Sequence, residues 1–165
     1  MVILVMGLPG SGKSYFAERL AKRLRADYMN TDVIRKSRLE KPTYTDEEKI
    51  MIYKEVFDAV YDHAYSRKPL VIDGTFYHRK IRDNFLKLAT DLNIELKWIE
   101  IVAEEPQIKK RLAEKREWSD ANFEVYKSIE EKYTPLVEDH LILKSVDGQV
   151  KAMVDKALVY ILKKY

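Results

Sequence analysis

Residues 2–20 read VILVMGLPGSGKSYFAERL, and this stretch decides the fold. The apolar run from Val2 to Met6 predicts a buried strand. A helix is predicted after the loop, because Phe16, Leu20 and Leu24 share one helical face. Between them the sequence satisfies the pattern G-x-x-x-x-G-K-S/T, in the strand–loop–helix context that a phosphate-binding loop requires. The alternative is a glycine-rich turn that matches by accident, and this context argues against it.

The composition of the loop indicates what it holds. Three of the five glycines of the chain lie in it, and they let the backbone curl with its N–H groups inward, toward a pyrophosphate. Lys13 is expected to reach the β and γ phosphates of a nucleoside triphosphate, and the Ser14 hydroxyl to ligate Mg²⁺. The residues expected to contact ATP are Gly7, Pro9, Gly10, Ser11, Gly12, Lys13, Ser14 and Tyr15.

The rest of the chain alternates strand-like and helix-like segments. Further strand-like runs lie at 27–30, 69–73, 94–102 and 140–145. The alternation predicts an α/β fold in three layers, with a mostly parallel sheet covered on both faces, as a single domain over residues 1–165. The expected apolar helix faces are Ile50, Tyr53, Phe57, Val60 and Ala64; Ile81, Phe85, Leu88 and Leu92; and Val150, Met153, Val154, Ala157 and Ile161.

Composition excludes several classes. The absence of cysteine excludes a disulfide framework and thiolate metal sites, and the three histidines lie too far apart in sequence to suggest a metal site. No stretch reaches the roughly 18 to 20 apolar residues of a membrane span. The net charge of +3 does not by itself indicate nucleic-acid binding. We therefore expect a cytoplasmic protein without a membrane partner, and the sequence says nothing of its oligomeric state.

Two aspartates follow strand-like runs. In open α/β sheets ligands bind outside the carboxyl ends of the strands, where Asp32 and Asp73 are both expected. Asp32, with Arg35 on the same side of a short helix, suits the general base that takes a proton from an attacking hydroxyl. Asp73 suits a carboxylate that holds Mg²⁺. The alternatives are a helix N-cap for Asp32 and a turn residue before Gly74 for Asp73.

Four motifs together resemble a known family. They are GLPGSGKS at 7–14, NTDVIR at 30–35, VIDGTF at 71–76, and the basic helix IKKRLAEKR at 108–116 followed by SDA. These stretches look like the P-loop kinases grouped around polynucleotide 5′-kinase, and the resemblance covers nearly the whole chain. The phosphate loop is shared by a far wider superfamily, whereas the N-x-D-x-x-R pattern is more selective.

The resemblance implies a P-loop NTPase fold whose five-stranded parallel sheet has the order 2-3-1-4-5. It also implies that Lys13 and Ser14 serve ATP and magnesium, that Asp32 is the general base, and that Arg35 contacts the acceptor. The donor would be a nucleoside triphosphate, and the acceptor a polynucleotide or nucleotide 5′-hydroxyl.

Residues 104–120 are expected to form a short helical lid. Phosphoryl transfer spreads negative charge over the equatorial oxygens, and lid arginines neutralise such charge. Arg111 and Arg116 are the catalytic candidates there. The alternative is an ordinary solvated helix with pairs such as Glu105 and Lys109.

Two loops complete the expected site. Three aromatic residues, Tyr44, Phe76 and Tyr77, are expected near loops at the strand edge, beside Arg79 and Arg82, and could form the floor of an acceptor pocket. The stretch SVDGQV at 145–150 is either a loop beside adenine or a turn in which Asp147 caps the last helix. The residues expected to contact the acceptor are Asp32, Arg35, Thr75, Phe76 and Arg79.

Three functions remain open from the sequence. The first is a kinase for the 5′-hydroxyl of a polynucleotide or nucleotide. The second is a kinase for a small alcohol such as a sugar acid, an antibiotic or a serine-like acceptor. The third is a module that binds ATP without transferring its phosphate, and Asp32 argues against it. An open basic channel would favour a polynucleotide, and a closed pocket a metabolite.

Overall fold

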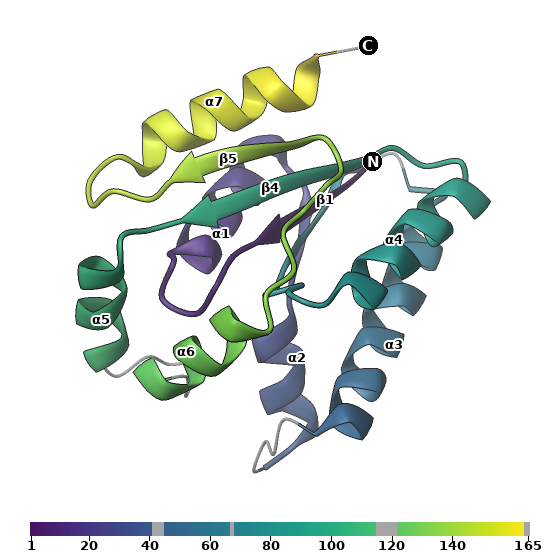
Figure 1. Ribbon diagram of the computed structural model, residues 1–165. Helices are drawn as coiled ribbons and strands as arrows, with labels where there is room; N and C mark the ends of the chain where they lie inside the picture. The colour runs from purple at the N-terminus through teal and green to yellow at the C-terminus, as the bar shows by residue number, and fades with distance from the viewer. Residues whose placement is uncertain (41–44, 67, 115–121, 164–165) are drawn as a thin grey trace.

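The computed structural model describes residues 1–40, 45–66, 68–114 and 122–163. Strands and helices alternate along nearly the whole chain (Figure 1). The elements are β1 (Val2–Met6), α1 (Lys13–Leu24), β2 (Asp27–Asn30), α2 (Thr31–Arg38), α3 (Asp46–His63), β3 (Leu70–Asp73), α4 (Arg79–Asp91), β4 (Leu96–Val102), α5 (Glu105–Ala113), α6 (Phe123–Glu131), β5 (His140–Lys144) and α7 (Val150–Leu162).

The sheet has five parallel strands in the order β2-β3-β1-β4-β5, which confirms the order implied by the family resemblance. The pairing register sets Asp73, the last residue of β3, between Val5 of β1 and Asn30 of β2. Because β1 is the central strand, the loop that follows it opens at the middle of the carboxyl edge. The ends of β2 and β3 therefore lie beside the phosphate loop.

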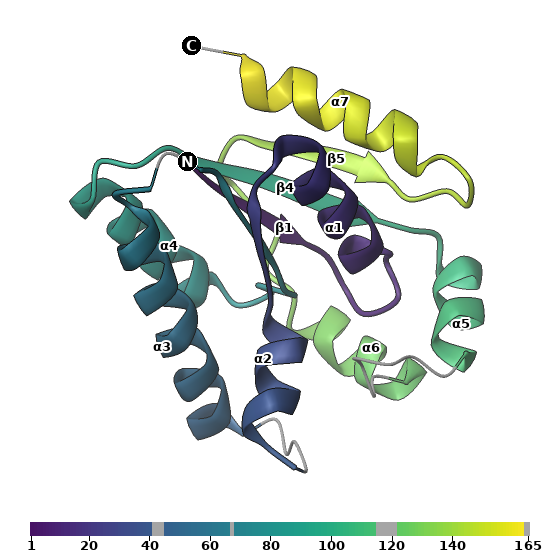
Figure 2. The ribbon, with the colours of Figure 1, turned by 180° about the vertical axis from the view of Figure 1, so that it is seen from behind.

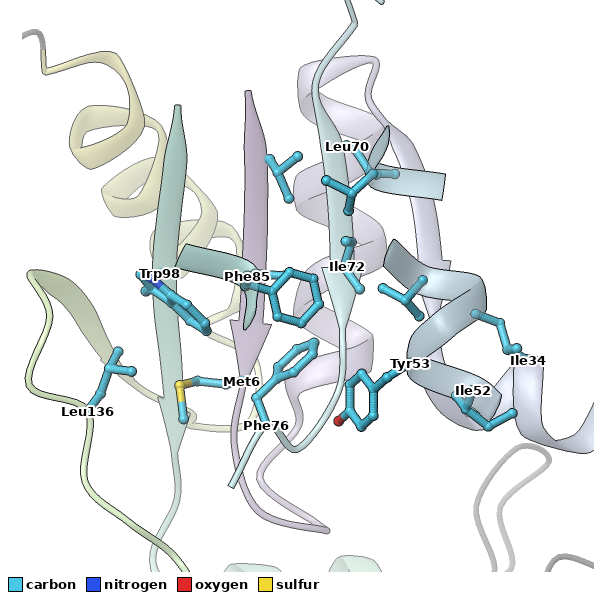
Figure 3. Packing of buried hydrophobic residues seen from close by; sticks show 14 residues of the cluster. Met6, Ile34, Ile52, Tyr53, Leu70, Ile72, Phe76, Phe85, Trp98 and Leu136 are labelled. Atoms are coloured by element: carbon cyan, nitrogen blue, oxygen red, sulfur yellow. The ribbon is translucent and has the colours of Figure 1, made fainter. Parts of the chain in front are cut away.

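Helices cover both faces of the sheet. On one face α1 and α7 pack together, and their buried core includes Phe16, Leu20 and Ala157. On the other face α3 and α4 enclose an aromatic core, in which Phe76 and Phe85 meet edge to face at 5.5 Å (Figure 3). Burial of these apolar faces stabilises the three layers.

The carboxyl edge carries the remaining helices. Figures 1 and 2 show α2, α5 and α6 gathered at the ends toward which the strands point. A small cluster of Ile108, Leu112 and Tyr126 joins α5 to α6, with Leu8 of the phosphate loop packed against it. Lys127 of α6 also pairs with Glu105 of α5 at 2.9 Å. The two helices therefore sit directly on the phosphate loop.

The apolar face expected in α3 is confirmed at Tyr53, Phe57 and Val60, which lie in or against the core, but it is wrong at Ile50. Ile50 was assigned to the buried stripe, but 69% of it is exposed. The first turns of α3 pack against α2, where Glu48 pairs with Arg35 and the buried Ile52 lies one turn further. Ile50 is two residues from each, which is about 200° around a helix, and so it faces away. The other predicted stripes of α4 and α7 lie against the core.

Within the part of the chain described above, none of the helices is both long and apolar enough to cross a membrane.

Candidate active site

The phosphate loop adopts a conformation that requires glycine. Gly7 has φ +154°, and a Cβ there would lie 2.5 Å from the carbonyl oxygen of Ile101. Gly12 has φ +93°, and a Cβ there would lie 2.8 Å from Ser145 Oγ. Both positions are closed to other residues, because the backbone is strained for an L side chain and the space is filled. The loop leads into α1, whose first residue is the buried Lys13.

Asn30, the last residue of β2, caps α2. Its Oδ1 accepts hydrogen bonds from the backbone N–H groups of Asp32 at 2.8 Å and Val33 at 3.1 Å. The N-cap of α2 is therefore Asn30, and the alternative that Asp32 serves as the cap is wrong. The Asp32 carboxylate is left for another role at the carboxyl edge.

The same asparagine holds Asp73 with its amide. Asn30 Nδ2 donates to Asp73 Oδ2 at 2.7 Å, and it also lies 3.2 Å from Tyr28 Oη and 3.4 Å from Ser14 Oγ. Tyr28 Oη donates to the same Asp73 oxygen at 3.1 Å. One side chain thus connects the helix that carries Asp32 to the carboxylate and hydroxyl expected to hold Mg²⁺.

Asp73 fits a magnesium site. Its carboxylate is 1% exposed, and its Oδ1 has no hydrogen-bond partner among the described residues. Burial raises the pKa of Asp73 to about 6, although the charge of Lys13 and the hydroxyl of Ser14 lower it. An oxygen buried without a partner is costly unless something binds it, and Mg²⁺ with its water shell needs only one or two protein oxygens. Ser14 and Asp73 are the residues that would hold the ion.

Substitution of Asn30 separates its two contacts. Asn30→Ser keeps an oxygen that can cap α2 and loses the amide donor to Asp73, whereas Asn30→Ala loses both. We expect Ala to unfold about 1 kcal/mol more easily than Ser, as measured by urea denaturation. Addition of Mg²⁺ should strengthen ATP binding about tenfold less in both variants than in the wild type, because Asp73 loses a charge-assisted hydrogen-bond donor. Equal stability of the two variants would contradict the cap.

The raised pKa of Asp73 predicts a pH-dependent stability. The folded protein holds the Asp73 proton more tightly than the unfolded chain, so this group's contribution favours folding below about pH 4 and weakens as the pH rises to about 6. Asp73→Asn removes the ionisation and should raise the free energy of unfolding at pH 7.5 by about 2 kcal/mol. Urea denaturation of both proteins at pH 5 and 7.5 measures it, and the gain should shrink at pH 5.

Asp32 is held by an ion-paired arginine. Arg35 Nη1 lies 2.8 Å from Asp32 Oδ1, and Arg35 Nε lies 2.8 Å from Glu48 Oε1 of α3. The arginine and Glu48 side chains are almost fully buried, whereas 29% of the Asp32 side chain is exposed. Arg35 therefore fixes the orientation of the Asp32 carboxylate, and the carboxylate remains partly exposed.

Two cavities flank the loop. The first, of about 500 Å³, runs along α1 to the loop before α7. The second, of about 250 Å³, lies between α2, α3, the β3–α4 loop and α6. The first is lined by Gly10, Gly12, Lys13, Ser14, Tyr15, Phe16, Glu18, Asn30, Asp32, Lys110, Arg111, Glu114, Ser145, Val146, Asp147, Gly148, Val150 and Met153. The second is lined by Pro9, Lys13, Asp32, Arg35, Lys49, Tyr53, Thr75, Tyr77, Ile81, Val125, Ser128, Ile129 and Lys132.

Lys13 and Asp32 are the two described residues that line both cavities. The cavities therefore meet at the lysine that is expected to hold the terminal phosphate and at the carboxylate that is expected to accept a proton.

Arg111 of α5 lies against the phosphate loop. Its Nη1 donates to the carbonyl oxygens of Gly10 at 3.2 Å and Ser11 at 3.0 Å, and its Nη2 pairs with Asp147 at 2.8 Å. Arg111 lines only the first cavity. Asp147 does not cap α7, whose N-cap is Gln149. The predicted pair of Glu105 and Lys109 is present at 3.1 Å.

Only some of the residues expected to contact the acceptor line the second cavity. Thr75 lines the second cavity, and so does Pro9, which was expected to contact ATP. Phe76 is fully buried in the aromatic core, so its side chain does not face the cavity, contrary to expectation. Arg79 is exposed, lines neither cavity, and lies 3.8 Å from Asp83 on its own helix. Arg116 and Tyr44 lie outside the described residues.

Arg82, which was expected beside the acceptor, lines neither cavity. Its guanidinium is buried and donates to the carbonyl oxygens of Phe76 at 2.9 Å and Pro135 at 3.2 Å. A backbone hydrogen bond from Thr134 to Tyr77 of 3.2 Å runs alongside. Arg82 therefore ties the β3–α4 loop to the segment that follows α6, and so fixes two walls of the second cavity to each other.

Sequence reasoning missed Asn30 as a site residue and missed the whole contribution of α6. The signal for Asn30 was its place at the end of β2, two residues before Asp32, where an asparagine side chain can cap a helix. The signal for α6 was weaker. Val125, Ser128, Ile129 and Lys132 have helical spacing, but nothing in the sequence shows which cavity they line.

Solved kinase structures share this architecture. A sugar kinase from Janibacter sp. superposes with a TM-score of 0.73 at 18% identity, covering 97% of this chain and 93% of the other. A gluconokinase from Sinorhizobium meliloti gives 0.71 at 21% identity, covering 96% and 89%. The APS kinase of Mycobacterium tuberculosis, solved with AMPPNP and APS, gives 0.73 at 15% identity, covering 98% and 97%.

The fold and the loop together define the class, which is the P-loop kinase fold. The chain belongs to the AAA domain family, whose model matches residues 2–136.

Proposed function

We propose that this protein is an ATP-dependent phosphotransferase that moves the γ-phosphate to a hydroxyl group of a small acceptor. The observation that carries the proposal is that Lys13 and Asp32 line both cavities. A module that only binds ATP has no need of a second cavity with a carboxylate at its junction with the first.

The donor side is supported by the phosphate loop. The loop N–H groups, the start of α1 and Lys13 suit the triphosphate, and the first cavity, of about 500 Å³ and lined by residues of α1 and of the loop before α7, has room for the nucleoside. Mg²⁺, held by Ser14 and Asp73, would neutralise charge on the β and γ phosphates. Asn30 keeps Asp73 in place, and the N-terminal end of α1 faces the bound phosphates.

The acceptor side is supported by Asp32. An acceptor hydroxyl in the second cavity would meet its carboxylate, which takes the proton as the oxygen attacks the γ-phosphorus. A new P–O bond forms to the acceptor oxygen, the bond between the γ-phosphorus and the β–γ bridging oxygen breaks, and ADP leaves with that electron pair. The ion pair with Arg35 would keep the Asp32 carboxylate oriented during this step.

The second cavity favours a small acceptor over a polynucleotide. Its volume of about 250 Å³ suits a molecule no larger than a nucleoside, and its lining comes from α2, α3, α6 and the β3–α4 loop. The 5′-hydroxyl end of a nucleic acid, expected from the family resemblance, would have to enter with its remaining nucleotides outside. The gluconokinase and the APS kinase with the same fold are named for small acceptors, which agrees with this choice.

The test is transfer of label from [γ-³²P]ATP to a panel of acceptors. The panel contains 5′-hydroxyl RNA, 5′-hydroxyl DNA, nucleosides, sugar acids, amino alcohols and aminoglycosides, each with Mg²⁺ and with EDTA. We expect label in a small alcohol and none with EDTA. Label in the oligonucleotides alone would overturn the choice of a small acceptor. Release of phosphate without any labelled acceptor would overturn the proposal that the protein is a kinase.

A further inference from the structure

A buried glutamate of α3 lies behind the expected general base. Glu48 is in the first turn of α3, where its backbone N–H donates to Oγ1 of the N-cap Thr45 at 3.3 Å. Its carboxylate lies 2.8 Å from Arg35 Nε, and Nη1 of the same arginine donates to Asp32 Oδ1 at 2.8 Å. One guanidinium of α2 thus bridges two carboxylates, a buried one on α3 and the partly exposed one at the junction of the two cavities.

The helices α2 and α3 are also attached to each other elsewhere. A second ion pair between them, Arg38 with Glu55, lies at the surface with contacts of 2.9 and 3.1 Å. Ile34 of α2 and Ile52 of α3 belong to the same buried core (Figure 3). Burial of a charged pair is costly, and apolar residues of similar volume often stabilise a protein at least as well. Attachment of the two helices therefore does not account for the buried pair.

The contact between Arg35 and Asp32 uses one carboxylate oxygen. An arginine can bind a carboxylate through two parallel N–H···O bonds, and this bidentate form is among the strongest hydrogen-bonded pairs in proteins. Here Arg35 meets Asp32 through Nη1 and Oδ1, and Oδ2 has no hydrogen-bond partner among the described residues. The ion pair of Nε with Glu48 holds the guanidinium in this direction. Asp32 Oδ2 is therefore available to an acceptor hydroxyl, whose proton it would take.

From this arrangement we infer that Glu48 is a positioning residue, which holds Arg35 so that the arginine contacts a single oxygen of Asp32 and leaves the other for the acceptor hydroxyl. The inference rests on the proposed function for the reaction that Asp32 serves, whereas the arrangement of the three side chains can be tested without it. When the negative charge of Glu48 is removed, the guanidinium is drawn more strongly to Asp32 and should turn to bind both of its oxygens. The carboxylate would then be occupied by the arginine and less able to take a proton.

A crystal structure tests the arrangement without any acceptor. Glu48→Leu fills the buried space and removes both oxygens that hold Arg35 Nε. The wild type and this variant are crystallised with AMPPNP and Mg²⁺. We expect one contact between Arg35 and Asp32 in the wild type, and two in the variant, each within about 3.2 Å. A single contact in the variant would contradict the inference. If the leucine variant does not fold, Glu48→Gln takes its place, because it keeps the shape and removes the charge.

Turnover tests the consequence for the base. Single-turnover transfer is measured for the wild type, Glu48→Leu, Asp32→Asn and the double variant, with the acceptor that the labelling panel identifies. Glu48→Leu should lower the rate by about 10- to 100-fold, a part of the 10²- to 10⁴-fold that a general base supplies, and leave the affinity for AMPPNP unchanged. In the Asp32→Asn background it should lower the rate no further, because the group that it positions is gone. The matched control Glu55→Gln, which weakens the surface pair between the same helices, should transfer at the wild-type rate.

The two measurements separate this inference from the proposed function. An unchanged rate in Glu48→Leu, an equal loss in the Asp32→Asn background, or a similar loss in Glu55→Gln would overturn the inference while leaving the kinase in place. If no acceptor is labelled but Arg35 binds both Asp32 oxygens in the variant crystal, the proposed function fails and the positioning of Asp32 by Glu48 stands.

Discussion

Asp32→Asn lowers kcat by about 10²- to 10⁴-fold and leaves the affinity for ATP nearly unchanged, if the carboxylate is the general base. Asparagine retains an oxygen that can accept the hydrogen bond from Arg35, so the geometry around α2 is preserved while the proton acceptor is lost. The helix cap is also preserved, because Asn30 provides it. The loss should therefore appear in the chemical step, measured as single-turnover transfer to the acceptor found by the labelling panel.

The matched control is Asp155→Asn on the exposed face of α7, which should transfer at the wild-type rate. Calorimetry with AMPPNP separates donor binding from chemistry. Normal turnover of Asp32→Asn would remove this residue from its role. A loss that is confined to ATP affinity would place the carboxylate on the donor instead, and would favour a binding module over a transferase.

The positions of the strands could be predicted, because their signal is local. The apolar runs from Val2 to Met6 and from Leu70 to Asp73 are too short and too rich in β-branched residues for helices, and both are strands in the structure. Their order in the sheet could not be obtained from periodicity. It came from the family resemblance carried by the phosphate loop and by NTDVIR, and the structure confirms it.

The residues around the acceptor could be predicted less well, because side-chain direction in a loop depends on distant contacts. Phe76 follows the polar stretch from Asp73 to Thr75, which suggests exposure. In the structure its φ of +44° turns the chain, and its ring packs between Phe85 and Trp98. Phe85 lies in α4 and Trp98 in β4, so the contact depends on how these two elements pack and no pattern local to Phe76 could have shown it.

The sequence likewise did not reveal that Asn30 connects Asp73 to the helix that carries Asp32. Asn30 occupies both the register position beside Asp73 and the cap position of α2, because the strand passes into the helix without a loop. The sequence showed Asn30 only as part of a family pattern. Its physical role follows from the sheet order, which brings β2 next to β3.

Lys13→Met has an equally large expected effect, because among the described residues Lys13 is the one cation that lines both cavities. Phosphoryl transfer relies on fixed positive charge around the moving phosphate, and loss of one such group costs at least about 10²- to 10³-fold in kcat. Methionine is chosen because Lys13 is buried, and the methionine side chain should fill the space that the apolar part of the lysine occupies. Transfer should fall and ATP should bind more weakly, in contrast to the effect expected for Asp32→Asn.

A second consequence of the same substitution can be measured without any acceptor. Burial raises the pKa of Asp73 to about 6, and the charge of Lys13 is the largest effect that opposes this rise. Lys13→Met should therefore raise the pKa of Asp73 further and make its ionised carboxylate more costly to bury. The variant should lose stability between pH 6 and 8, and Asp73→Asn should restore it. In a double-mutant cycle the two substitutions are therefore non-additive. Additive free energies of unfolding would show that Lys13 and Asp73 do not interact.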